Sequence, residues 1–109
     1  MPSQDGIWII NAAAETVLAN DRMADILGTT SADMVGQPSF EYVFEEDREA
    51  AQQLFQIRSK GGYEPFHFRL RRKDGSAVWV DVQGTPMFNA AGEFNGIVGT
   101  FTLSSRTGW

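Results

Sequence analysis

The stretch FHFRLRRKDGSAVWVDV, residues 66–82, alternates apolar and polar side chains on both sides of a central turn. The turn is Lys73-Asp74-Gly75-Ser76, a composition typical of hairpin connections. Alternation with a period of two places every second side chain on the same face of a strand. The stretch therefore predicts a β-hairpin whose apolar face carries Phe66, Phe68, Leu70, Val78, Val80 and Val82.

Three further strands are expected outside this hairpin. Residues 93–103 alternate in the same way after a turn at 89–92. Near the start of the chain, residues 6–11 and 16–19 are short apolar runs bounded by turn-forming residues. Such runs are typical of buried strands, and their short separation predicts a second hairpin.

The middle of the chain carries helical patterns instead. Asn20 can cap a helix over residues 21–27, and Ser31 can cap a short helical turn. The longest helix is expected from Glu45 to about Lys60. We therefore expect an α+β fold, a five-stranded antiparallel sheet with helices packed on one face. Because the helical crossover must return the chain to the sheet, the first and last strands should be neighbours.

Composition excludes several classes of function. The chain has 109 residues, 42% of them hydrophobic, which suits one compact domain. Its net charge of -5 argues against nucleic acid and membrane surfaces as partners. It has no cysteine, so disulfides, thiolate nucleophiles and cysteine zinc sites are excluded. With no apolar run of about 20 residues and no secretory signal, a cytoplasmic location is expected.

The order of these elements, together with several short motifs, resembles the PAS family. The motifs follow the family's order and spacing over residues 5–104, nearly the whole chain. They are Ile7-Trp8-Ile9-Ile10-Asn11, Met23-Ala24-Asp25-Ile26-Leu27-Gly28, Asp33-Met34-Val35-Gly36, Glu46-Asp47-Arg48, Arg72-Lys73-Asp74-Gly75-Ser76 with Val78-Trp79-Val80, and Gly92-Glu93 with Gly96-Ile97-Val98-Gly99.

The resemblance implies a non-catalytic sensory module. Residues 1–109 are then one PAS-type sensor domain, a fragment of a larger protein, with a bacterial sensor histidine kinase of a two-component system as the expected host. Such a domain binds a small ligand or partner and shifts an attached output domain between two states. The alternative is a ligand-free module for protein–protein interaction or dimerisation.

Three departures from the family pattern stand out, and one is Glu45, where the family often has a proline before the acidic pair. The family often has glycine in the first hairpin turn, where this chain has Ala14 or Glu15. Its last strand commonly runs into Asp-Ile-Thr, whereas this chain has Leu103-Ser104-Ser105. The resemblance therefore does not establish the usual connection to an output domain.

The inner face of the sheet and the helices above it define a candidate ligand pocket. An apolar, aromatic cavity there suits a flat cofactor or a small apolar or aromatic ligand. If the domain is a ligand sensor, we expect the cavity to have a volume of a few hundred Å³. A filled core is the competing expectation, because a small domain needs its apolar residues for stability. Gly84 and Gly99 favour a ligand, since glycine inside a strand often marks a close approach. The candidate residues are Trp8, Ile10, Met23, Ile26, Leu27, Met34, Leu54, Phe55, Phe66, Phe68, Leu70, Val80, Val82, Ile97, Gly99 and Phe101.

No cofactor or catalytic group is identified. His67, the only histidine, is expected on the outer face as a solvated side chain, whereas haem sensors of the family use a histidine on the long helix. Cysteinyl flavin is excluded without a cysteine, and nothing specific indicates non-covalent flavin. No metal site is expected. Glu45, Glu46 and Asp47 are interpreted as solvated acids at a helix start rather than catalytic carboxylates.

The outer face of the sheet is a candidate interface. Alternation directs Ile7, Ile9, Trp79 and Val98 away from the helices. A solvated sheet face is normally polar, so these side chains predict a contact surface. In the PAS family this face commonly packs on a flanking helix or a second copy, which implies a homodimer. Scattered surface hydrophobic residues are the alternative.

Overall fold

The computed structural model describes residues 5–109. Over these residues the chain forms strands, α-helices and two short 3-10 helices, the latter labelled η. In chain order the elements are β1 (Gly6–Asn11), β2 (Thr16–Ala19), α1 (Asp21–Leu27), α2 (Ser31–Met34), η1 (Ser39–Tyr42), η2 (Glu45–Asp47), α3 (Arg48–Ser59), β3 (Phe66–Arg71), β4 (Ala77–Phe88) and β5 (Phe94–Leu103).

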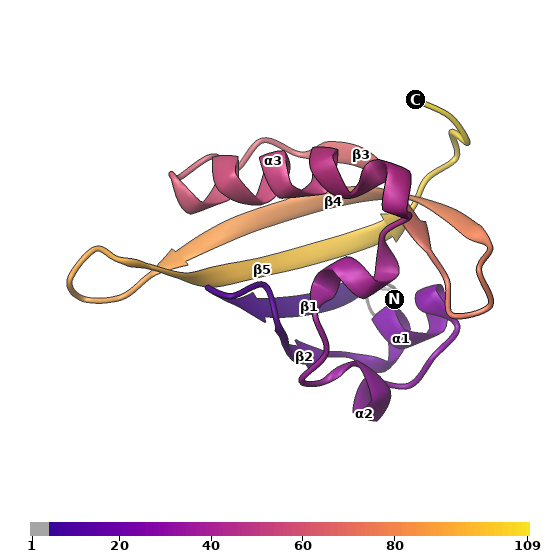
Figure 1. Cartoon of the computed structure of the whole chain (residues 1–109), viewed down its shortest axis with the longest axis horizontal. Helices are drawn as coiled ribbons and strands as arrows, with labels where there is room; N and C mark the ends of the chain where they lie inside the picture. Colours follow the sequence, from indigo (N-terminus) through magenta and orange to yellow (C-terminus); the bar gives the residue numbers. More distant parts are fainter. Residues whose placement is uncertain (1–4) are drawn as a thin grey trace.

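The strands form one five-stranded antiparallel sheet in the order β2-β1-β5-β4-β3 (Figure 1). The first and last strands are neighbours, as predicted, because β1 pairs with β5 from Gly6 opposite Phe101 to Asn11 opposite Gly96. The expected hairpin also forms, with Phe68 opposite Val80. The α+β prediction is therefore confirmed.

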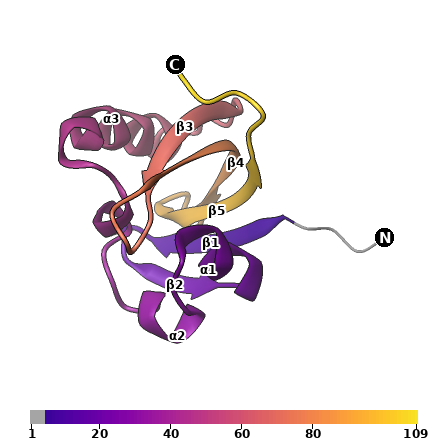
Figure 2. The ribbon, with the colours of Figure 1, turned by 90° about the vertical axis from the view of Figure 1, so that its right-hand side faces the viewer.

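The helices cover one face of the sheet. Figure 2, turned by 90°, shows α3 on one side of the curved sheet. The first helix packs on β1, α2 on β2, and α3 on β4 and β5. The inner face therefore has two parts, one under α1 and α2 and the other under α3. No helix in the described part of the chain is long and apolar enough to cross a membrane.

Side-chain caps explain where the short helices begin. Asn20 accepts a hydrogen bond of 2.8 Å from the backbone N–H of Met23, which caps α1 as predicted. The predicted cap of α2 was wrong by one residue. Thr30, rather than Ser31, accepts from the backbone N–H of Asp33 at 3.2 Å.

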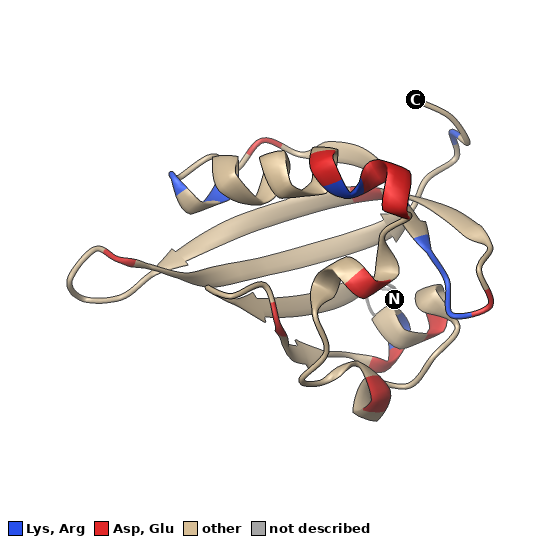
Figure 3. Ribbon diagram, viewed as in Figure 1, with Lys and Arg blue, Asp and Glu red and all other residues tan. Residues whose placement is uncertain are grey.

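The longest helix begins later than predicted. Glu45–Asp47 form the separate turn η2, and α3 begins at Arg48. Figure 3 shows the acidic residues gathered at this end of the helix, where the helix dipole favours negative charge. Asp47 does not cap the helix; its carboxylate pairs with Arg69 instead.

Apolar side chains from both parts of the inner face build one core. Met23, Leu27 and Met34 from the first two helices are fully buried, as is Val80 of β4. The buried core residues are Trp8, Ala19, Met23, Ala24, Ile26, Leu27, Met34, Val43, Phe68, Leu70, Val78, Val80 and Val82.

Candidate functional site

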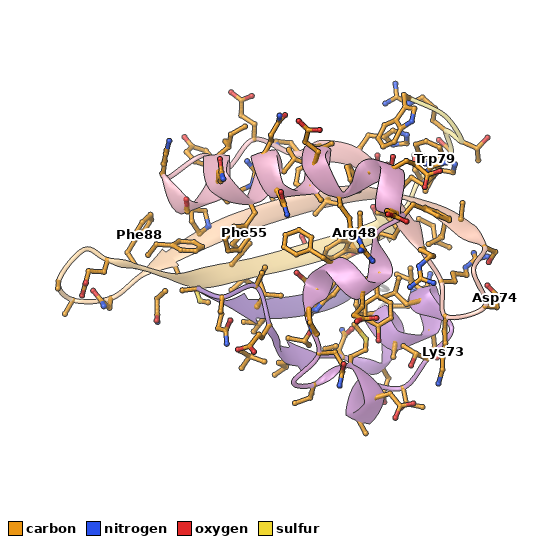
Figure 4. All side chains as sticks on the ribbon, in the orientation of Figure 1. Arg48, Phe55, Lys73, Asp74, Trp79 and Phe88 are labelled. Atoms are coloured by element: carbon orange, nitrogen blue, oxygen red, sulfur yellow. The ribbon has the colours of Figure 1, made fainter. Side chains whose placement is uncertain are left out.

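A cavity of about 130 Å³ lies between α3, η1 and the inner face of the sheet. Figure 4 shows Phe55 pointing from α3 toward the sheet, where it helps to form the wall. The cavity is smaller than the few hundred Å³ expected for a ligand sensor. The lining residues are Trp8, Ile10, Ser39, Phe40, Val43, Ala51, Leu54, Phe55, Arg58, Phe66, Phe68, Leu70, Val82, Gly84, Ile97, Gly99 and Phe101.

The structure brings together most of the predicted pocket residues. Those in the lining are Trp8, Ile10, Leu54, Phe55, Phe66, Phe68, Leu70, Val82, Ile97, Gly99 and Phe101. The predicted residues outside the lining are Met23, Ile26, Leu27, Met34 and Val80, which are buried in the core. The reason is that α1 and α2 pack directly on β1 and β2, whereas α3 and η1 leave a gap.

Sequence reasoning did not include six lining residues in the pocket. Ser39, Phe40 and Val43 belong to or follow η1, a short 3-10 turn with no periodicity from which its inward face could be predicted. Ala51 and Arg58 could have been found, because they lie three residues before and four residues after Leu54 on the same helix face. The sixth is Gly84.

The two strand glycines in the lining have a different explanation from the one predicted. Gly84 and Gly99 lie directly opposite each other on β4 and β5. A Cβ at Gly84 would lie 3.1 Å from Nε of Arg58, and a Cβ at Gly99 would lie 2.6 Å from the ring of Phe101. The glycines therefore make room for side chains of the chain itself.

Aromatic packing shapes the rest of the wall. The indole of Trp8 lies 5.7 Å from the ring of Tyr42 and 5.6 Å from that of Phe101, measured between centroids. Its Nε1 donates a buried hydrogen bond of 2.9 Å to Oγ1 of Thr16. Because this polar atom is satisfied away from the cavity, Trp8 presents an apolar surface to it.

Arg58 is the charged residue of the lining and is 4% exposed. It lies in the last turn of α3, donates through Nη2 to the backbone carbonyl of Glu64, and has its guanidinium 5.0 Å from the ring centroid of Phe66. Burial lowers the pKa of the guanidinium, and the nearby carboxylate of Glu64 partly offsets this effect.

A family model described as the PAS fold matches residues 3–102. The chain belongs to the PAS family. The predicted resemblance is thereby confirmed at the level of the family. Among curated protein sequences, none matches the chain.

Solved structures show the same fold at low sequence identity. The PAS domain of a protein from Colwellia psychrerythraea is 17% identical, with a TM-score of 0.84 over 94% of this chain and 88% of that one. The PAS-B domain of Cycle from Drosophila melanogaster, with bound ethylene glycol, is 17% identical, with a TM-score of 0.78 over 91% of this chain and 99% of that one. A sensory box histidine kinase/response regulator from Burkholderia thailandensis is 18% identical, with a TM-score of 0.74 over 94% and 78%.

The outer face of this PAS domain carries an apolar row across three strands. Ile9 of β1 lies opposite Leu18 of β2 on one side and Val98 of β5 on the other. Leu18 is 44% exposed, and the other two are half-buried. Ile7 is on the same face and lies opposite Thr100. Three of the four predicted interface residues therefore lie together.

Trp79, the fourth predicted interface residue, lies apart from this row. Val98 faces Thr85 on β4, six residues from Trp79, a distance of about 20 Å along the strand. Trp79 stacks on His67 with ring centroids 5.2 Å apart, and Trp109 packs edge-on against it at 4.8 Å. The C-terminal segment therefore covers part of Trp79 (Figure 4).

The expectation that His67 is a solvated side chain was wrong, although its place on the outer face was right. Its side chain is 11% exposed because Trp79 covers one face of the ring. Nδ1 lies 3.1 Å from a carboxylate oxygen of Asp81, and Nε2 lies 2.8 Å from the carbonyl of Gly108. His67 thus joins β3, β4 and the C-terminal segment.

The acids at the start of α3 were also only partly predicted. Glu45 and Glu46 are exposed, as expected, but Asp47 is 8% exposed and lies 2.8 Å from Nη2 of Arg69. Within residues 5–109, no cluster of three or more histidine or acidic side chains could hold a metal ion.

Proposed function

We propose that this PAS domain is a sensor that binds a small apolar or aromatic ligand in the cavity between α3, η1 and the sheet. The cavity itself carries the proposal, because its walls are almost wholly apolar and it opens beside the buried core. A cavity of about 150 Å³ holds benzene in an engineered protein. The cavity of about 130 Å³ is of the size that one aromatic ring needs.

The effect of ligand binding would be transmitted to an attached output domain through β5. This strand lines the cavity with Ile97, Gly99 and Phe101 and ends at Leu103. The next residue continues the pairing of β5 with β4, because the backbone N–H of Ser104 donates to the carbonyl of Trp79 at 2.9 Å. A ligand that favours one arrangement of β5 would therefore shift the population of arrangements of the segment that follows it. The domain itself performs no catalysis in this proposal.

The similar structures support a role in signalling. One of them is a sensory box histidine kinase/response regulator, and another is a PAS-B domain with bound ethylene glycol. We infer a host of the sensor histidine kinase type, in a bacterial two-component system in the cytoplasm. The end of β5, at Leu103-Ser104-Ser105, differs from the Asp-Ile-Thr that is common in the family.

A second surface favours pairing with another copy of the domain. The row of Leu18, Ile9 and Val98 is aliphatic and contains no charge. A homodimer through this face is compatible with a ligand in the cavity. If the cavity takes no ligand, a ligand-free interaction or dimerisation module is the remaining function.

Filling the cavity tests the sensor. We expect benzyl alcohol, a neutral single-ring probe, to bind the wild-type domain and to shift amide NMR signals of the cavity wall. Ala51→Leu places three more carbons at the cavity wall and should weaken binding at least about tenfold, because the probe loses its space. Titration followed by NMR measures both affinities.

Ala50→Leu is the matched control, since Ala50 is exposed on the same helix and lies outside the cavity lining. This variant should bind the probe like the wild type. No binding to the wild-type domain, or equal binding to Ala51→Leu, would contradict the sensor proposal. Native mass spectrometry of the protein as purified adds a direct search for a retained ligand.

A further inference from the structure

Arg58 is a buried cation in the wall of an apolar cavity. Of the other lining side chains, only Ser39 and the bonded indole of Trp8 carry a polar group. Removing a guanidinium from water is costly unless an anion or several acceptors replace the lost hydration. We therefore expect the guanidinium in this wall to have an anion or several hydrogen-bond acceptors as partners.

The fold reserves space for the guanidinium. Gly84 lies directly against it, and a Cβ there would lie 3.1 Å from Nε and 3.7 Å from Cδ of Arg58. The ring of Phe66 lies 5.0 Å from Cζ on another side. Gly84 of β4 leaves room for the Arg58 side chain, and Phe66 of β3 contacts it. Two strands therefore determine the position of this arginine.

The contacts of Arg58 leave a buried donor without a partner. Nη2 donates to the carbonyl of Glu64, but Nε is buried and has no hydrogen-bond partner among the described residues. The side chain of Glu64 is itself exposed. A buried N–H without an acceptor is unfavourable, and an arginine donates to a carboxylate through two neighbouring N–H groups.

We propose that the ligand of this cavity is a small monocarboxylate with an apolar or aromatic body, whose carboxylate binds the guanidinium of Arg58. The proposal rests on the sensor function and names its ligand class. One guanidinium balances one negative charge, whereas a doubly charged phosphate would leave excess charge in an apolar site. The apolar walls accept the body of the ligand, which the volume limits to about one ring.

Arg58 could instead serve only to hold the loop after α3 through the carbonyl of Glu64. In that case its removal would change stability, and the cavity would have no preference for charge. The two roles differ in ligand selectivity, which is measured on the wild-type domain before any substitution is made.

The test compares benzoate with benzamide, a neutral molecule of the same shape. We expect benzoate to bind the wild type about tenfold or more tightly than benzamide, as charge-assisted hydrogen bonds require. Benzoate, and not benzamide, should move the Nε–H NMR signal of Arg58. Arg58→Gln keeps an amide that can donate to Glu64 and should lose the preference for benzoate. Arg48→Gln, an exposed arginine on the same helix, should keep it.

The outcomes separate this inference from the sensor proposal. If benzyl alcohol binds in the cavity while benzoate and benzamide bind equally, the carboxylate inference is wrong and the sensor remains. Equal loss of preference in Arg48→Gln would also overturn it, because the effect would then come from net charge. If none of the three probes binds, both proposals fail. If Arg58→Gln does not fold, the preference of the wild type for benzoate over benzamide and the shift of the Arg58 Nε–H signal still test the carboxylate inference.

Discussion

Asp74 shows how one exposed residue fixes the turn of the central hairpin. Its carboxylate accepts hydrogen bonds from the backbone N–H of Ser76 at 2.9 Å and from the Ser76 hydroxyl at 2.6 Å. The hydroxyl, followed by the backbone N–H, holds the pKa of Asp74 below its ordinary value of 3.8. The charged form is thus the one that stabilises the turn.

This depressed pKa sets the sign of a pH effect. The contribution of Asp74 to stability is present above pH 3.8 and is lost as the pH falls through its pKa in the folded protein. We expect Asp74→Ala to lower the free energy of unfolding more at pH 7 than at pH 3, measured by urea denaturation. Ser76→Ala should raise the midpoint of the Asp74 carboxyl titration observed by NMR; an unchanged midpoint would exclude the hydroxyl as the main cause.

The first hairpin turn shows what the sequence could and could not predict at this scale. Ala14 has a φ of 64°, in the left-handed region where the family often has glycine. This conformation costs a residue with a Cβ about 1–2 kcal/mol. The missing glycine was visible in the sequence. The burial of Ala14, which is 5% exposed and offsets part of that cost, depends on tertiary packing that no local pattern contains.

Between elements, one ion pair ties the start of α3 to the edge strand β3. Nε and Nη2 of Arg69 lie 2.9 and 2.8 Å from the same carboxylate oxygen of Asp47. The guanidinium also lies 4.6 Å from the ring centroid of Phe44. Arg69 alternates toward the outer face, so its long side chain reaches around the sheet edge to make these contacts.

Breaking the pair between Asp47 and Arg69 should destabilise the domain more than breaking the exposed contact between Glu46 and Arg69. Asp47→Asn leaves a largely buried arginine without its counter-charge and should lower the free energy of unfolding by about 1–3 kcal/mol. Glu46→Gln removes a carboxylate that is 3.8 Å from the same Nη2 but 69% exposed on its side chain, and should cost about 0.5 kcal/mol or less. Urea denaturation measures both, and equal effects would contradict the structural role of Asp47.

The elements themselves were predictable where the pattern was periodic. Alternation gave the hairpin of β3 and β4, and the cap at Asn20 gave the start of α1. The segment between α2 and α3 has no such pattern, since it folds into η1 and η2. Ser39, Phe40 and Val43 of that segment line the cavity, so this part of the site could not be predicted.

At the scale of the whole molecule, the cavity is a consequence of how elements distant in sequence meet. The sequence identified the apolar residues of the inner face, and eleven of the sixteen lie in the lining. It could not show that α1 and α2 close tightly on the sheet while α3 stands off it. Nor could it show Arg58 in place of the missing side chain of Gly84, because that contact joins a helix and a strand far apart in the chain.

The outer face gives the prediction that belongs to the whole molecule. Leu18, Ile9 and Val98 form an uncharged row, whereas Trp79 is already partly covered by Trp109. A two-fold dimer would bring two copies of the row together and remove it from water. We therefore expect the wild-type domain to self-associate at high concentration, as measured by sedimentation velocity over a concentration series.

A charge in the middle of the row should prevent this pairing. Ile9→Lys places two ammonium groups near the two-fold axis and should leave the domain monomeric, because burying like charges is strongly unfavourable. Val35→Lys adds the same charge at a site that is 50% exposed after α2, away from the row, and should associate like the wild type. A wild-type domain that stays monomeric throughout would exclude the dimer. Equal dissociation in both variants would show that net charge, rather than the row, controls association.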